Sequence, residues 1–213
     1  MHQVLEGVYA MNEKPILFSS PMVRAILDGR KTQTRRIIKD AHGAFWDHAG
    51  YRPSLLNGQI MGWEPLDGGP PIEEGSPRPR CPYGFPGGRL WVRENFYVMP
   101  DLWAENHGPQ PIHYAADVAD RNQVEDYASK PSIHMPRWAS RVTLLVKSVR
   151  VERVQDITED DARREGAPRQ PIDCVPREKY RSDFQYLWER INGPESWASN
   201  PWVWVVEFER VKP

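Results

Sequence analysis

The sequence predicts an α+β fold: a mixed β-barrel with a few short helices and two long, loop-rich insertions. Three observations lead to this expectation. Several segments have the alternation or the β-branched composition of strands, long connections separate them, and helical patterns are few. At 213 residues, the chain is expected to form a single domain over residues 14–213. Residues 1–13 are expected to be a flexible tail, with either Met1 or Met11 as the start.

The first predicted elements are a short strand, a helix and a second strand. Residues 15–18 are apolar and precede Ser20, which can cap a helix, and Pro21, which suits a first helical turn. Gly29 fits the left-handed residue that commonly ends a helix. Residues 35–39 form the next strand candidate. At helical spacing, one face of the helix carries Met22, Val23, Ile26 and Leu27.

Two insertions are predicted, at residues 40–88 and 100–136. In the first, Gly, Pro and scattered aromatic residues leave no helical period, and a loop of this length is uncommon unless it is functional. The second contains a short strand candidate at 112–115. Between the insertions, residues 89–98 form a clear strand. One face of it carries Leu90, Val92 and Phe96, and the other carries Trp91, Arg93 and Tyr97.

The last third of the sequence predicts two strands and two helices. Residues 141–151 are strongly β-branched, as in a buried strand. Thr158 and Gly166 bound a short helix, and a second helix is expected near 181–191. Residues 202–211 form the last strand, apolar on both faces at first and alternating later. Val142, Leu144 and Val146 are predicted to face the core. The second helix carries its apolar residues at i, i+3, i+4 and i+7, namely Phe184, Leu187, Trp188 and Ile191.

Composition bounds the function classes. The formal net charge is −1 at pH 7, so nucleic-acid binding would have to come from a local patch. The sequence has no apolar run of membrane-spanning length and no signal-peptide pattern, and a cytoplasmic protein without membrane contact is expected. The two cysteines, Cys81 and Cys174, and the six histidines lack ligand spacing. Neither a metal nor another cofactor is therefore predicted.

A dense group of anion-seeking side chains follows the first helix. Such a group on a turn indicates a phosphate or nucleotide site. The alternative is a solvated face, because a helix C-terminus attracts Lys and Arg through its dipole. The group consists of Arg30, Lys31, Thr32, Thr34, Arg35, Arg36 and Lys39.

The order of residues 25–36, Ala-Ile-Leu-Asp-Gly-Arg-Lys-Thr-Gln-Thr-Arg-Arg, resembles the signature of the ASCH domain family, within the PUA-like superfamily. A second match lies at residues 149–166, and two matches in the right order are more specific than one. The resemblance implies a PUA-like β-barrel over about half of the chain and an association with RNA or nucleotides. In size and in its aromatic-rich insertions the chain is similar to longer ASCH proteins of phage and prophage.

Some small bacterial ASCH members are amidohydrolases that remove the acyl group of N4-acetylcytidine with a Lys, a Thr and a Glu. The resemblance puts these residues at Lys31, Thr34 and Glu165. A lysine kept neutral by neighbouring arginines can take the proton of the threonine hydroxyl, and the glutamate can protonate the departing amine. Each residue also has a purely structural explanation. The insertions have no counterpart in those hydrolases, and they could either narrow the cleft or fill it.

Further ligand-binding candidates lie near these residues and on a later strand. Arg35 or Arg36 could hold a phosphate or the anionic oxygen of an intermediate. The resemblance puts the strand that carries Arg93 and Glu94 next to the cleft, with an internal ion pair as the alternative.

Trp138 lies between Arg137 and Arg141, an arrangement that can stack a nucleobase and hold its phosphates. Alternatively, Trp138 plugs the end of the barrel. The predicted ligand-binding residues are thus Arg30, Arg35, Arg36, Arg93, Glu94, Arg137 and Trp138.

The leading functional hypothesis is an RNA- or nucleotide-binding ASCH protein with a basic cleft between the first helix and the barrel. Its predicted lining is Lys31, Thr34, Arg35, Arg93 and Glu165. The alternative is an amidohydrolase that acts on N4-acylated cytidine-type nucleosides. A third hypothesis is a phage accessory protein that binds an unidentified protein partner through exposed tryptophans.

Overall fold

The computed structural model describes most of the predicted domain. The backbone is described for residues 13–38, 51–56, 59–65, 80–98, 112–119, 124–125, 127–167 and 180–212. Side chains are described for the same residues, apart from 51–56 and 59–65. The predicted tail, except for its last residue, lies outside the described residues. The same holds for most of the predicted insertion at 40–88 and for part of that at 100–136.

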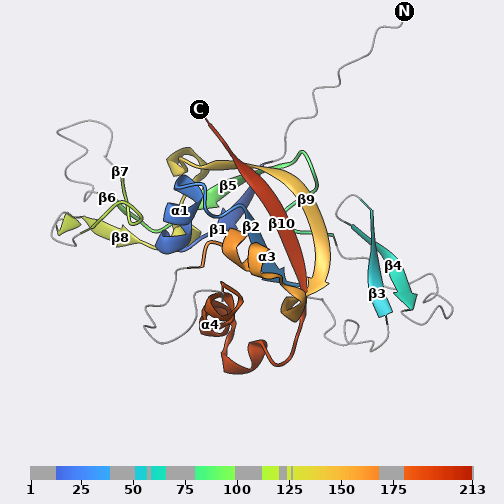
Figure 1. Cartoon of the computed structure of the whole chain (residues 1–213). Coiled ribbons are helices and arrows are strands. Elements are labelled where there is room, and N and C mark those ends of the chain that lie inside the picture. The colour runs from blue at the N-terminus through green and yellow to red at the C-terminus, as the bar shows by residue number, and fades with distance from the viewer. Residues whose placement is uncertain are drawn as a thin grey trace, which may run out of the picture.

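The fold is α+β and is built on a mixed five-stranded sheet (Figure 1). Its strand order is β1 (Lys14–Leu17), β5 (Arg89–Arg93), β9 (Thr143–Arg153), β10 (Trp202–Val211) and β2 (Gln33–Ile37). β1 and β5 run parallel, whereas the other neighbouring strands are antiparallel. β9 and β10 curve strongly in Figure 1. β1 and β2 are the two edges, so the described strands form an open, curved sheet and not a closed barrel.

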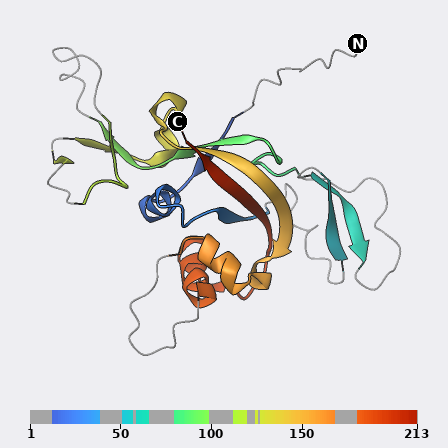
Figure 2. The same ribbon diagram turned by 45° about the horizontal axis from the view of Figure 1, so that its top comes forward.

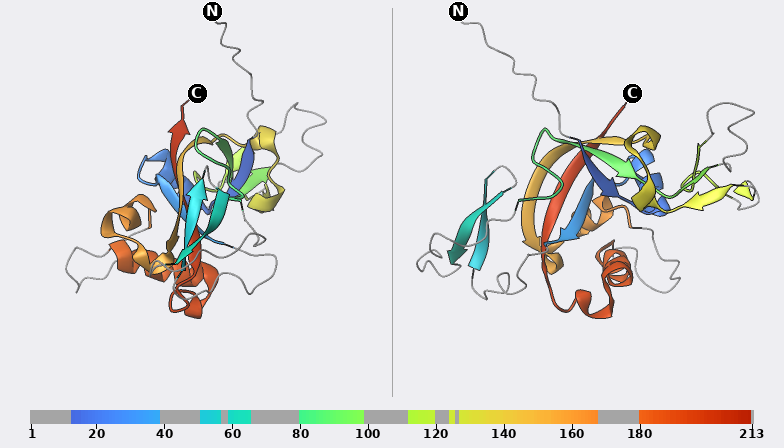
Figure 3. Two further views of the ribbon diagram at one scale, coloured as in Figure 1. Left: turned by 90° about the vertical axis from the view of Figure 1, so that its right-hand side faces the viewer. Right: turned by 180° about the vertical axis from the view of Figure 1, so that it is seen from behind.

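Two smaller antiparallel sheets lie on opposite sides of the main sheet (Figure 3). β6 (Phe96–Val98) pairs with both β7 (Ile112–Tyr114) and β8 (Ala128–Lys130). β3 (Tyr51–Leu56) and β4 (Gln59–Pro65) form a hairpin. This hairpin falls in the predicted insertion at 40–88, where the sequence analysis expects loops. The signal for it is the Asn-Gly dipeptide between the two strands, which is typical of tight hairpin turns.

The helices in the described part of the chain cover both faces of the main sheet. α1 lies on one face, and α3 and α4 lie together on the other (Figure 2). The α-helices are α1 (Ser20–Leu27), α3 (Glu159–Arg164) and α4 (Tyr180–Asn192). The short 3-10 helices are η2 (Ser132–His134), η3 (Arg137–Ala139), η4 (Val154–Asp156) and η5 (Pro194–Ser196).

Two hydrophobic cores share β10 as a common wall. Trp204, Val206 and Phe208 pack with α1 in the first core. Val203 and Val205 point the other way and pack with α3 and α4 in the second. Because successive strand residues face opposite sides, a strand covered on both faces must be apolar at every position. This explains the apolar beginning of residues 202–211, which are confirmed as a strand.

Several element boundaries differ from the predicted ones. Ser20 is the first helical residue and not the cap, and Ser19 in the cap position makes no side-chain cap hydrogen bond. β2 ends at Ile37, two residues before the predicted end at 39. The predicted strand at 89–98 is interrupted at residues 94–95, where the chain leaves the main sheet for the β6 sheet. Ile191, the last residue of the apolar stripe predicted for the second helix, is 56% exposed.

Candidate functional site

The two sequence motifs that carry the predicted site are in direct contact. The Thr32 backbone N–H donates a hydrogen bond to the Arg164 carbonyl at 2.9 Å. Gly166 ends the α3 turn at φ +68°, and a Cβ atom there would lie 2.8 Å from Cβ of Lys31. Only a glycine fits this approach without displacement. The end of α3 therefore packs against the chain that enters β2.

Lys31 and Glu165, two members of the predicted triad, form a buried ion pair. Lys31 is 2% exposed, and its Nζ donates to Glu165 Oε2 at 2.9 Å. The same Nζ donates to the Gln33 carbonyl at 2.8 Å and to the Glu165 carbonyl at 2.7 Å. Three acceptors use all three N–H groups of an ammonium, whereas a neutral amine has only two. The arrangement is therefore that of a protonated lysine.

Several influences act on the pKa of Lys31. Burial is the largest and lowers it, the Glu165 carboxylate opposes this, and Arg36 and Arg35 lower it further. The predicted repulsion by neighbouring arginines thus contributes, but burial contributes more. Arg30 is exposed instead, and its Nη2 pairs with Asp28 Oδ2 at 2.8 Å.

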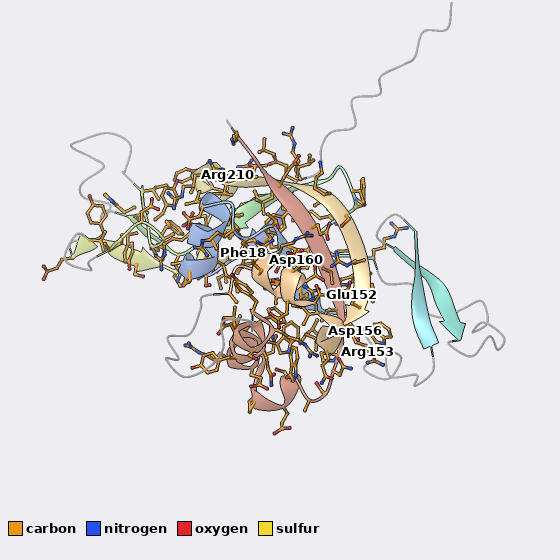
Figure 4. All side chains as sticks on the ribbon, in the orientation of Figure 1. Phe18, Glu152, Arg153, Asp156, Asp160 and Arg210 are labelled. Carbon is orange, nitrogen blue, oxygen red and sulfur yellow. The ribbon has the colours of Figure 1, made fainter. Side chains whose placement is uncertain are left out.

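Arg35 is an internal counter-ion. Its side chain is fully buried, and Nη1 donates to Glu165 Oε1 at 3.1 Å. Nη2 donates to Glu152 Oε2 at 3.0 Å and to Asp161 Oδ2 at 3.2 Å. Burial raises the pKa of Asp161, but the charge of Arg35 and its other partners outweigh this and lower it overall. Figure 4 labels Glu152 at its place on β9.

The charges around Arg35 are balanced within the protein. Arg150 extends the network, because it also pairs with Glu152, Asp161 and Glu207. Carboxylates outnumber cations in the resulting cluster, and its interior is not the basic cleft that the sequence suggests. The cluster consists of Lys31, Arg35, Arg150, Glu152, Asp161, Glu165 and Glu207.

A small cavity lies between β2 and α4 and is here called the β2–α4 cavity. It measures about 60 Å³, well below the few hundred Å³ of a typical ligand pocket. The predicted residues Thr34, Arg35, Arg36 and Glu165 line it together. Its other lining residues are Met22, Ile37, Phe184, Leu187, Trp188, Ile191 and Asn192.

Two donors of the β2–α4 cavity lack partners among the described residues. The Nε atoms of Arg35 and Arg36 are both buried without a hydrogen bond. Arg36 uses Nη2 on the Leu17 carbonyl at 2.6 Å, and its guanidinium lies 5.4 Å from the Phe18 ring centre. Thr34 is 3% exposed, and within the described residues no hydrogen bond joins its hydroxyl to Lys31 or Glu165.

Glu94 is buried apart from this cavity and pairs with Arg141. Its Oε1 accepts from Arg141 Nε at 3.0 Å, and its Oε2 accepts from Nη2 at 3.2 Å. Burial raises the pKa of Glu94, against the hydrogen bond from Arg141. An internal ion pair is therefore confirmed for Glu94. Arg93 instead donates to the Met135 carbonyl at 3.0 Å and does not line the β2–α4 cavity.

Trp138 lies on the surface. It is 77% exposed, whereas Met135 and Ala139 of the same segment are buried. The expectation that Trp138 plugs the end of a barrel is therefore wrong. Arg137 pairs through Nε with Glu13 Oε2 at 2.6 Å, and Arg141 pairs with Glu94 and Asp117.

The α4 wall of the cavity and two of the carboxylates beside Arg35, those of Glu152 and Asp161, were missed as site residues. Phe184 and Trp188 were predicted on the apolar stripe of the second helix, and their helical spacing carries no sign that they line a cavity. Within the described residues, no group of His, Cys, Asp or Glu is arranged to hold a metal ion. In the same part of the chain, no helix has the length and apolarity needed to cross a membrane.

Comparison with known proteins provides no relative from which the site could be interpreted: no protein-family model, no curated protein and no solved structure matches this chain.

Proposed function

We propose that the chain binds a nucleoside or nucleotide in the β2–α4 cavity. The observation that carries this proposal is the common lining by Thr34, Arg35, Arg36 and Glu165. These residues come from two motifs far apart in the sequence, and they meet beside two aromatic side chains of α4. Hydroxyl, guanidinium, carboxylate and aromatic groups around one cavity are the groups that recognise a nucleobase.

We also propose that the fold is a PUA-like member of the ASCH family. Support comes from the curved mixed sheet, from α1 between β1 and β2, and from the cavity beside the second motif. The resemblance concerns the main sheet and its helices, and it does not extend to the β3–β4 hairpin.

The ligand is expected to present an uncharged, planar group to this cavity. Arg35 is already neutralised by three carboxylates, so the cavity has little charge to offer a phosphate. The free Nε–H groups of Arg35 and Arg36 suit acceptor atoms such as the carbonyl oxygen and ring nitrogen of cytosine. Because the cavity is small, α4 must shift outward before a base can enter.

Calorimetric titration with cytidine and N4-acetylcytidine tests this proposal. Arg36→Met removes one free donor and is expected to weaken binding about 10- to 100-fold, the cost of a hydrogen bond to a charged group. The matched control is Arg210→Met, because Arg210 also donates to a backbone carbonyl, that of Leu27 at 3.3 Å, but does not line the cavity. Equal weakening in both variants, or no binding by the unmodified protein, would refute the proposal.

Amide hydrolysis is the second candidate, favoured by the direct contact between Lys31 and Glu165. Once neutral, Lys31 takes the Thr34 proton as the hydroxyl oxygen attacks the amide carbonyl. Lys31 passes this proton to Glu165 through their hydrogen bond. When the C–N bond breaks, Glu165 protonates the departing amine, and water then hydrolyses the ester left on the threonine. The step requires Lys31 to lose a proton and Thr34 to approach it.

Release of cytidine from N4-acetylcytidine decides between binding and hydrolysis. Thr34→Val keeps the side-chain shape and removes the nucleophile, so it is expected to abolish turnover, whereas Thr34→Ser should retain part of it. Turnover that persists in Thr34→Val, or no turnover in the unmodified protein, removes the hydrolase candidate and leaves the binding proposal standing.

A further inference from the structure

A second and larger cavity is lined by the end of α3 and is here called the arginine cavity. It measures about 660 Å³, within the range of small-molecule sites. Glu165 lines the β2–α4 cavity, and the next two residues along the chain line the arginine cavity. Its lining residues are Gly29, Arg30, Thr32, Arg163, Arg164, Gly166, Ala167 and Tyr180.

The lining of the arginine cavity has the chemistry of an anion site. Arg30, Arg163 and Arg164 supply guanidinium groups, and no carboxylate is among the lining residues that the structure describes. Thr32 and Tyr180 add hydroxyl groups from the α1–β2 connection and from the start of α4. This lining contrasts with the β2–α4 cavity, where the guanidinium of Arg35 is surrounded by carboxylates.

The ion pairs of these arginines lie at the surface. Arg163 and Arg164 share one carboxylate, that of Asp160, at 2.8 and 2.7 Å. Their side chains are 61% and 47% exposed. Water screens pairs of this kind, and they contribute little to stability. Two cations on one carboxylate leave a positive charge beside the cavity, and a phosphate can replace Asp160 at small cost. Figure 4 labels Asp160 on α3.

We propose that the arginine cavity binds the phosphate of a nucleotide whose base occupies the β2–α4 cavity. The inference rests on the proposed function, because it assigns the second half of the same ligand. The two linings adjoin along the chain, because Glu165 lines the β2–α4 cavity and Gly166 lines the arginine cavity, and a base and its phosphate are likewise joined through one sugar. The phosphate belongs either to a free mononucleotide or to the backbone of a single-stranded nucleic acid.

Calorimetric titration with cytidine, cytidine monophosphate and a short oligocytidylate tests this assignment. The unmodified protein is expected to bind the monophosphate at least about 10-fold more tightly than cytidine. Arg163→Gln with Arg164→Gln should remove this advantage and leave cytidine affinity unchanged. The charge-matched control is Lys147→Gln with Lys212→Gln, because both lysines lie outside the two cavities and only Lys147 has a described pair, with Glu209 at 3.3 Å.

The outcomes separate the two proposals. Equal affinity for cytidine and its monophosphate, or equal losses in the test and control variants, overturns the phosphate site and keeps the nucleoside site. If monophosphate binding depends on Arg163 and Arg164 but is unchanged in Arg36→Met, the phosphate site is kept and the nucleoside site in the β2–α4 cavity is overturned. If the protein binds neither cytidine, nor the monophosphate, nor the oligocytidylate, both the nucleoside site and the phosphate site are overturned.

The oligocytidylate identifies the source of the phosphate. A nucleic-acid backbone is assigned if the oligocytidylate binds more tightly than the monophosphate and its binding depends on salt. The slope of the logarithm of the binding constant against the logarithm of the salt concentration should then be smaller by about one to two in the double arginine variant. If the oligocytidylate and the monophosphate bind with equal affinity, the phosphate is that of a free mononucleotide.

Discussion

The two motifs of the site can pack together at Gly166 because this residue has no side chain. A Cβ atom there would lie 2.8 Å from Cβ of Lys31 and 3.0 Å from Cβ of Ala25, at a φ of +68°. Gly166→Ala is therefore expected to lower the free energy of unfolding by about 2–4 kcal/mol, through backbone strain and overpacking together. Urea unfolding measures this loss.

Gly29 provides the matched control for Gly166. Its φ is +73°, but a Cβ atom there meets nothing within 4 Å. Gly29→Ala should therefore cost only the backbone strain, about 1–2 kcal/mol. If the two variants lose the same free energy, the close packing of Gly166 against Lys31 is not energetically important.

Arg35 shows what a sequence leaves open about a single side chain. Its neighbours in the chain are cations and hydroxyls, which favours an anion site. Its neighbours in space are Glu152, Asp161 and Glu165, which lie more than 100 residues away in the chain. The resemblance of the two motifs to the ASCH family, and not residue type alone, selected Lys31, Thr34 and Glu165. Residue type and local spacing could not tell a solvated cation from a buried counter-ion, because that depends on tertiary contacts.

At the scale of elements, η3 and the chain before it present one face to the core and one to solvent. Trp138 is 77% exposed, whereas Met135 is fully buried. Trp138→Ser is expected to change the free energy of unfolding by less than about 0.5 kcal/mol, as for other surface substitutions. Met135→Ala should cost about 2–5 kcal/mol through the cavity that it leaves.

Thermal or urea unfolding of the two variants checks this contrast. A large loss in Trp138→Ser would contradict the exposed position of this side chain. Unchanged stability with weakened RNA binding would instead support base stacking on Trp138, the role predicted for it together with Arg137.

The sequence predicts elements best where the hydrophobic pattern is strong and unbroken. β10 and α4 agree with the prediction within one residue, because burial on both faces and an apolar stripe leave clear periodicities. The strand at 89–98 was predicted to be continuous, since alternation does not reveal a change of sheet. Glu94 marks the break, and its carboxylate pairs with Arg141, 47 residues further along the chain.

At the scale of the whole molecule, the α+β class was predictable and the closure of the sheet was not. Composition and spacing indicate strands, but pairing partners depend on register and on long connections. Much of the two predicted insertions lies outside the described residues, so their effect on the cleft stays a prediction.

The ion network links three parts of the molecule, and its strength depends on pH. Asp161 on α3 pairs with Arg35 on β2 and with Arg150 on β9. Its pKa is lowered from the ordinary value of 3.8. Below that value the unfolded chain takes up the proton first, so stability falls as the pH drops through the lowered pKa. Between pH 7 and pH 3, the free energy of unfolding of Asp161→Asn should therefore fall by less than that of the unmodified protein.

Urea titrations at the two pH values measure this difference. The control is Asp28→Asn, because Asp28 forms a pair that is about half exposed on each side. If Asp161→Asn loses as much stability on acidification as the control and the unmodified protein, Asp161 does not link the three elements.

The place of β10 in the strand order has a consequence for folding during synthesis. It is the last described strand to leave the ribosome, yet it lies between β9 and β2. β2 is made about 165 residues earlier and pairs with no other strand among the described residues. The nascent chain must therefore keep β2, with Arg35 and Arg36, without its β10 partner until β10 has been made. Such late pairing of distant segments is slow, and it makes a nascent chain of this kind a natural client for chaperones.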